Sequence, residues 1–308
     1  MQFGNAKTKK ALLLCAGFFL FFSFFHNWIG KGNDFIFHFE QARGNCAEGY
    51  SEWTCEKYPP LFHIISKPFV LSHFTFKLFI LFLFAFLTPF LLYLISRRVV
   101  AVPLYFASSY FYFIQAGQYA QGLTMILLLS MFAFRSNIRW LVRGLALIFA
   151  PYTHSYALPL IAFTFFLLLL QEGAKRLGFL AGCSPFWGKQ GAPKPLAKPL
   201  TKVYPPQALT LNTILSFLAK ICPLPFLIIG LKELWKKKEF IMLAVIMLSA
   251  VASLHNNRTL YTIPLLIMPA VASYHSRIGK KKKRWLNLLI LLFVAFQFEQ
   301  FVAFNLIC

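Results

Sequence analysis

The chain has 308 residues, of which 58% are hydrophobic and 18% aromatic, while only 13% are charged. The charged fraction lies well below the roughly 25% of soluble domains, which excludes an ordinary soluble protein and favours a multi-spanning membrane protein. Lysine and arginine number 31 against nine acidic residues, giving a formal net charge of +22, and the cations stand in short clusters between apolar runs. Cytoplasmic loops of membrane proteins show this distribution, so we expect anionic membrane lipids as partners and no nucleic acid.

Charge clusters and polar breaks divide the chain into ten apolar segments, each expected to be a membrane-crossing helix. Several are shorter than the roughly 20 residues that span the hydrocarbon core, so some must be broken or line a cavity. We predict an all-α, polytopic transmembrane bundle of about 10–11 crossings that forms one integral membrane domain over residues 1–308. The segments lie at about 11–29, 74–95, 99–115, 117–134, 139–152, 154–171, 209–231, 240–254, 259–275 and 285–305.

The first apolar segment follows a lysine-rich start and is longer than a signal-peptide core, so we expect it to be retained as a crossing. With the N-terminus in the cytoplasm, residues 30–73 form an external loop. The same orientation places the polar residues at 115–121, 151–154 and 255–258 outside, where they can meet one another.

Two arrangements of residues 139–171 remain open. The segment is either a hairpin of two short helices, which we favour, or one long helix kinked at Pro151 and Pro159. The hairpin requires the basic, proline-rich connecting segment 172–208 to cross the membrane once. The single helix avoids that crossing but leaves a basic loop outside.

The external loop 30–73 holds most of the chain's acidic chemistry. Asp34 is the only aspartate, and five of the nine acidic residues lie within residues 34–56. A carboxylate where a membrane helix meets water is a candidate general base or cation ligand. The alternative is a helix N-cap for the segment 35–42, since Asn33 and Asp34 both favour that position. A helix there would place Asp34 and His38, four residues apart, on one face.

Cys46 and Cys55 lie in this same loop, nine positions apart. They either form a disulfide, as an oxidising compartment allows, or remain reduced. The other cysteines show no metal-binding spacing, and those in apolar segments are interpreted as small hydrophobic residues.

With the loop outside, the order of parts resembles the GT-C superfamily of integral membrane glycosyltransferases, which take a sugar from a polyprenyl-phosphate donor. Four segments carry the resemblance. They are Asp34 with His38, Glu40, Arg43 and the following Tyr58-Pro59-Pro60-Leu61-Phe62-His63, then Ala116-Gly117-Gln118, then Thr153-His154, and finally Arg258-Thr259-Leu260-Tyr261-Thr262-Ile263-Pro264.

The resemblance implies metal-independent, inverting transfer of a sugar to a lipid-linked glycan or other hydroxyl acceptor, as in mannosyltransferases, in a prokaryotic plasma membrane. Asp34 would be the catalytic base and Arg258 the contact to the donor phosphate. Substrate-binding residues would be His38, Glu40, Tyr58, Gln118 and His154. No cofactor is expected. A metal is not expected either, because no Asp or Glu lies between Glu56 and Glu172 and hard cations need several carboxylates.

Other interpretations stay open. Arg258 could extend to lipid headgroups, and His154 could be a solvated residue at a helix end. The glutamines at 115, 118 and 121 could form hydrogen bonds with exposed backbone groups at a helix turn. The chain could also be a transporter or lipid flippase, or a non-catalytic subunit of a larger assembly. A transporter would be expected to show repeated halves and ionisable residues inside crossings, and the sequence shows neither. If the chain is an enzyme, a partner subunit could contribute acceptor recognition. The enzyme hypothesis predicts that Asp34 lies near the turn at 115–121.

Overall fold

The computed structural model describes residues 5–26, 33–108, 110–115, 117–134, 138–154, 156–177, 223–252 and 262–307. These ranges contain helices and no strand, which confirms the all-α fold class. In chain order the α-helices are α1 (Ala6–Phe24), α2 (Asn33–Arg43), α3 (Glu52–Lys57), α4 (Leu61–Ser66), α5 (His73–Leu81), α6 (Thr88–Ser96), α7 (Ala101–Phe106), α8 (Tyr110–Gln115), α9 (Tyr119–Ala133), α10 (Arg139–Phe149), α11 (Ala157–Leu177), α13 (Leu224–Lys236), α14 (Phe240–Ala252), α15 (Thr262–Arg277) and α16 (Lys280–Ile307).

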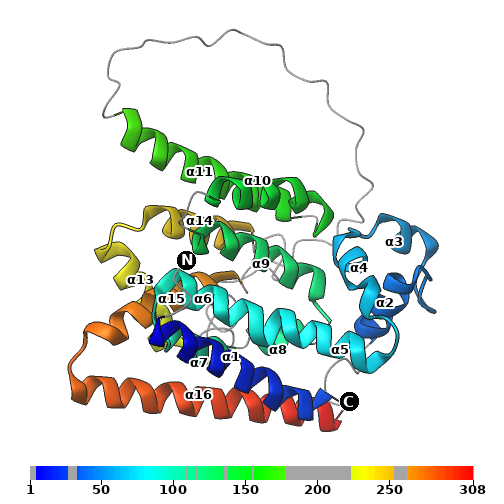
Figure 1. Ribbon diagram of the computed structural model, residues 1–308, viewed down its shortest axis with the longest axis horizontal. Helices are drawn as coiled ribbons and strands as arrows, with labels where there is room; N and C mark the ends of the chain where they lie inside the picture. Colours follow the sequence, from blue (N-terminus) through cyan, green and yellow to red (C-terminus); the bar gives the residue numbers. More distant parts are fainter. Residues whose placement is uncertain are drawn as a thin grey trace.

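The longer helices lie with their axes in roughly the same direction, so the molecule has two distinct ends (Figure 1). The short helices α2, α3 and α4 gather at one end, on the right of the view. The turn between α15 and α16 lies at the other. The first loop therefore forms a cap over one end of the bundle.

The opposite end collects the cationic clusters of the sequence. Thr8, at the start of α1, bonds to the Tyr93 hydroxyl near the end of α6, with 2.8 Å between the oxygens. Arg277, at the end of α15, pairs with Glu233 near the end of α13. We call this the basic end, and it comprises residues 7–10, 97–98, 139–143, 236–238 and 280–284.

Residues 139–171 form a hairpin. Arg139 and Arg143, in the first half of α10, both pair with Glu172 near the end of α11, at N–O distances of 3.5 and 2.7 Å. The two helices are therefore antiparallel, joined through a 3-10 turn at Ala150–Tyr152. The hairpin prediction is confirmed and the single kinked helix is wrong. Of the connecting segment 172–208, residues 178–208 lie outside the described residues.

The longest apolar helix is built from α5, a π-helical turn at Phe82–Leu87, and α6. Pro89 has no N–H and its ring crowds the carbonyl four residues earlier, so the preceding turn widens. The Thr88 hydroxyl donates to the Leu83 carbonyl at 2.9 Å within this wider turn. The widened turn presents Phe84 to α9, where an added Cβ on Gly122 would lie only 2.5 Å from the Phe84 ring.

One helix among the described residues, His73–Ser96, is long and apolar enough to cross a membrane by length and composition. Three shorter apolar helices follow it at Tyr119–Ala133, Ala157–Gly173 and Phe240–Val251. The segment predicted at 99–115 is broken into α7 and α8, as its short length suggested. The segment predicted at 285–305 begins earlier, because α16 includes the lysine cluster from Lys280 onward.

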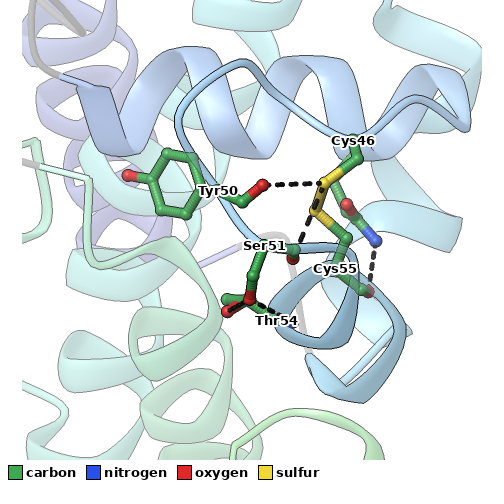
Figure 2. Close-up of a disulfide and its surroundings, with 6 residues drawn as sticks. Cys46, Tyr50, Ser51, Thr54 and Cys55 are labelled. Carbon is green, nitrogen blue, oxygen red and sulfur yellow. Dashed lines mark hydrogen bonds between the residues drawn. A yellow bond between two sulfur atoms is a disulfide. The ribbon is translucent and has the colours of Figure 1, made fainter.

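The Cys46–Cys55 disulfide closes the loop between α2 and α3 (Figure 2). The two Cα atoms are 5.7 Å apart. Within the bridged loop, the Ser51 hydroxyl accepts from the Thr54 N–H at 3.2 Å and begins α3. Gln41 of α2 donates from its amide to the Cys55 carbonyl at 2.7 Å, which ties the loop back to α2. The disulfide that the sequence left open is present.

Replacing both cysteines with serine is expected to lower the stability of this cap by about 2–3 kcal/mol, because a short cross-link restricts the unfolded chain. Thermal unfolding of the wild type with and without a reductant measures the loss, and the Cys46→Ser/Cys55→Ser variant should not respond to the reductant. Equal melting temperatures of the wild type and the variant under oxidising conditions would contradict the prediction.

Candidate active site

Asp34 lies in the first turn of α2, and its carboxylate is held by two neutral donors. The Tyr50 hydroxyl donates to Oδ1 and the Gln118 side-chain amide donates to Oδ2, each at 3.2 Å. The two donors come from the disulfide loop and from the turn before α9. The carboxylate is partly buried and makes these side-chain contacts instead of capping the helix, so the N-cap interpretation is wrong.

Gly117 brings the backbone of the turn before α9 directly against Asp34. Its φ of +110° is a conformation that only glycine adopts readily. A Cβ added at this position would lie 2.3 Å from the Cβ of Asp34, far inside contact distance. The prediction that Asp34 lies near the turn at 115–121 is therefore confirmed.

One helical turn after Asp34, His38 forms a buried pair with His63 of α4. His38 Nδ1 and His63 Nε2 are 2.9 Å apart, and the two rings stack with centroids separated by 5.1 Å. The side chains are only 3% and 5% exposed. Burial lowers the pKa of His63 to about 4, and burial together with the neighbouring His63 places the pKa of His38 well below its ordinary 6.5. Both rings are neutral at pH 7.

The pair shares one hydrogen bond, between Nδ1 of His38 and Nε2 of His63. The backbone of Gly117 also interacts with the His38 ring and raises its pKa, which partly offsets the effect of burial. The pair therefore lies against the turn that packs on Asp34. Asp34 and His38 face the same turn, as their spacing predicted.

Aromatic rings enclose the histidine pair. Tyr58 packs on both, with its ring centroid 5.4 Å from His38 and 5.5 Å from His63. Tyr119, the first residue of α9, lies 5.2 Å from the His38 ring and stacks on Phe62. Tyr58 is half-buried, and its ring contacts with His38 and His63 are packing contacts within the cap.

The remaining predicted residues lie in different places. Glu40 accepts from Asn45 at 2.9 Å and from Arg43 at 3.1 Å, away from Asp34, and these donors lower its pKa. His154 is half-buried with its ring against Tyr156 at 4.5 Å, and it is close enough to His38 to affect its pKa. Arg258 lies outside the described residues.

Sequence reasoning missed Tyr50 and His63 as parts of the site. Tyr50 stands between the bridged cysteines, and only the disulfide indicates that its loop folds back toward α2. His63 is 25 positions from His38, so no helical spacing links the two. Within the described part of the chain, no three His, Cys, Asp or Glu side chains are placed to share a metal ion.

Acidification from pH 7 to pH 5 is expected to destabilise the fold through His63. Its pKa is about 4 when folded, against an ordinary 6.5, so below pH 6.5 the unfolded chain binds a proton that the folded chain does not. The stability that it contributes is full above pH 6.5 and is lost as the pH falls toward 4, by about 2 kcal/mol at pH 5. Thermal unfolding at both pH values measures this loss.

A His63→Gln variant keeps an amide donor near the position of Nε2 and removes the titrating group, so it should lose less stability on acidification than the wild type. The matched control is His73→Gln, which removes an exposed histidine from the same cap. The control should behave as the wild type does. A His63→Gln variant that loses as much stability as the wild type would refute the assignment of a neutral, buried pair.

Comparisons of the chain with models of known protein families, with curated proteins and with solved structures found no match. Its function is inferred from the residues and their geometry.

Proposed function

We propose that the protein is a polytopic membrane glycosyltransferase that takes a sugar from a polyprenyl-phosphate donor and transfers it, with inversion, to a hydroxyl acceptor. The observation that carries the proposal is the setting of Asp34. The only aspartate of the chain stands at the end of the bundle opposite the basic end, and two neutral donors fix its carboxylate. A fixed and partly exposed carboxylate suits a general base.

The surface of the bundle supports several membrane crossings. Among the described residues, large apolar side chains that are half or more exposed occur on seven helices, although a soluble protein would bury such a number of them. They include Leu13 and Leu20 of α1, Leu141 and Ile148 of α10, Phe166 and Leu170 of α11, Met247 and Val251 of α14, and Leu291, Leu292 and Phe296 of α16. A lipid environment would cover these side chains without a partner protein.

The two ends of the bundle support an orientation. Cationic clusters favour the cytoplasmic side, which is where we place the basic end. The disulfide at the other end favours an oxidising compartment, which agrees with an external cap. Asp34 would then act on the non-cytoplasmic face.

In the proposed reaction, the acceptor hydroxyl attacks the anomeric carbon of the sugar from the face opposite the lipid phosphate. A bond forms between the acceptor oxygen and that carbon while the bond from the carbon to the phosphate oxygen breaks. The electron pair leaves with the polyprenyl phosphate, and the hydroxyl proton passes to Asp34. Each carboxylate oxygen has a second lone pair, so Asp34 can accept this proton while Tyr50 and Gln118 hold it in place.

Other residues would bind the substrates. Arg258 is proposed to contact the leaving phosphate, where charge builds as the sugar bond breaks. His154 and Gln118 are proposed to line the sugar site. An apolar groove of about 530 Å³ between α1 and α16, lined in part by Gly17, Phe21 and Leu291, is suited to the prenyl chain of the donor.

The experiment is a transfer assay with the purified full chain in liposomes. A panel of polyprenyl-phosphate sugars is supplied with lipid-linked glycan acceptors, and release of polyprenyl phosphate is measured together with the anomeric configuration of the product. Release with one donor and an inverted product supports the proposal. Movement of donor lipid between leaflets without release would favour a flippase, and neither activity with any donor would favour a non-catalytic subunit.

A further inference from the structure

The basic end contains a polar cavity that the proposed reaction does not use. It has a volume of about 600 Å³ and lies between the ends of α6 and α9, the first half of α10, the end of α11 and the turn between α13 and α14. Pro269, Ala270 and Ser273 of α15 close another side. The cavity is thus formed by segments far apart in sequence, at the end of the bundle away from Asp34.

Cations dominate the lining of this basic cavity. Its charged residues are Arg97, Arg98, Arg139, Arg143, Lys237, Glu172 and Glu239. Five cationic and two anionic side chains therefore line the same cavity, which leaves an excess of positive charge. An excess of positive charge inside a cavity, where water is limited, attracts an anion more strongly than the same charges on a flat surface.

The cations divide into a structural group and a group without acidic partners. Arg139 and Arg143 are both engaged by Glu172, and Arg143 also donates to the Met131 carbonyl at 3.3 Å. Lys237 bonds to the Ser273 hydroxyl. In the part of the chain that the structure describes, neither Arg97 nor Arg98 pairs with a carboxylate. Two exposed guanidinium groups are therefore free to meet an anion at the cavity.

Arg97 also occupies an unfavourable backbone conformation. It ends α6 with a φ of +56°, in the left-handed region where glycine or asparagine is usual. A larger residue there costs on the order of 1 kcal/mol. Backbone strain at a cavity is a sign of function when the side chain itself is needed. Arg97 has such a side chain, because guanidinium groups bind two oxygens of a phosphate together.

We propose that this basic cavity binds a phosphate-bearing group through Arg97 and Arg98. The volume lies within the range of small-molecule sites, and two adjacent guanidinium groups suit a phosphomonoester or a diphosphate. The same chemistry is offered by an anionic lipid headgroup and by a soluble phosphate compound. The inference depends on the lining of the cavity alone and not on the proposed sugar transfer.

The test uses the full chain in a non-ionic detergent with inorganic pyrophosphate as the soluble probe, and nanodiscs containing phosphatidic acid as the lipid probe. Saturable binding of pyrophosphate identifies a soluble ligand, and saturable binding only in phosphatidic acid nanodiscs identifies a lipid headgroup. The Arg97→Gln/Arg98→Gln variant should bind the effective probe at least ten-fold more weakly.

The matched control is Lys280→Gln/Lys281→Gln, which removes the same charge from the basic end at positions that do not line the cavity. The control should bind as the wild type does. Equal weakening in both variants, or no saturable binding of either probe, would overturn the proposal in favour of general attraction to the basic end. If the double arginine variant does not fold, Arg98→Gln alone is measured, and wild-type affinity in it would overturn the proposal equally.

Discussion

Asp34→Asn is expected to abolish sugar transfer while the protein stays folded. Asparagine has the same shape, and its Oδ1 can still accept from Tyr50 while the Gln118 amide turns over to accept from its Nδ2, but it cannot accept the proton of the acceptor hydroxyl. Loss of a general base lowers turnover by roughly 10²–10⁴-fold, which corresponds to roughly 3–5 kcal/mol in the barrier. The turnover rate at saturating donor and the melting temperature in detergent are the two measurements.

The control for this prediction is Glu56→Gln, which removes an exposed carboxylate from the same cap. It should keep the wild-type rate, because Glu56 is not among the groups that hold or surround Asp34. Wild-type turnover in Asp34→Asn would leave the proposed enzyme without its base. An equal loss in Glu56→Gln would show that activity depends only on the negative charge of the cap.

Gly117→Ala, in the turn before α9, is expected to damage both stability and activity more than a methyl addition at any glycine of the cap. The residue would have to keep a φ of +110°, and its Cβ would lie 2.3 Å from that of Asp34. Backbone strain and overpacking together cost roughly 2–6 kcal/mol. The turn can avoid this cost only by moving away, which separates Gln118 from Asp34 and takes the Gly117 backbone away from the His38 ring.

Two glycines of the cap distinguish the cost of backbone strain from the cost of steric overlap. Gly44 and Gly49 also have positive φ values, of +91° and +86°, but an added Cβ at either position meets nothing within 4 Å. Alanine at these positions should therefore cost only the backbone strain, about 1 kcal/mol, and leave transfer nearly unchanged. Thermal unfolding and turnover of the three variants test the difference. Equal effects at all three positions would show that the approach of the turn to Asp34 is unimportant.

The main outline of the site could be predicted from the sequence because it follows from topology. Asp34 and Gln118 both stand where an apolar segment meets the same polar layer, so they were expected to lie close together. The hairpin of α10 and α11 was favoured from the sequence, although the prolines at 151 and 159 also allowed one long kinked helix. These inferences need only the alternation of apolar and polar segments.

Other features of the site depend on side-chain contacts that no spacing reveals. The pairing of His38 with His63 follows from the packing of α4 on α2, and neither residue has a sequence signature for it. The N-cap hypothesis for Asp34 failed because the helix begins at Asn33, two residues earlier than predicted, which places the carboxylate in the first turn. Boundaries of helices are decided by contacts with neighbouring elements, and propensity alone does not fix them.

Because Tyr50 lies between Cys46 and Cys55, the Asp34 site is complete only after the disulfide has formed. In the proposed orientation the loop is delivered across the membrane with its thiols reduced, and cross-linking by oxidation follows translocation. Until then the segment bearing Tyr50 is not held against α2, and Asp34 retains only the Gln118 amide. Newly inserted chains would therefore pass through an immature stage, and the rate of their maturation would be set by the thiol-oxidising capacity of the compartment that receives the cap.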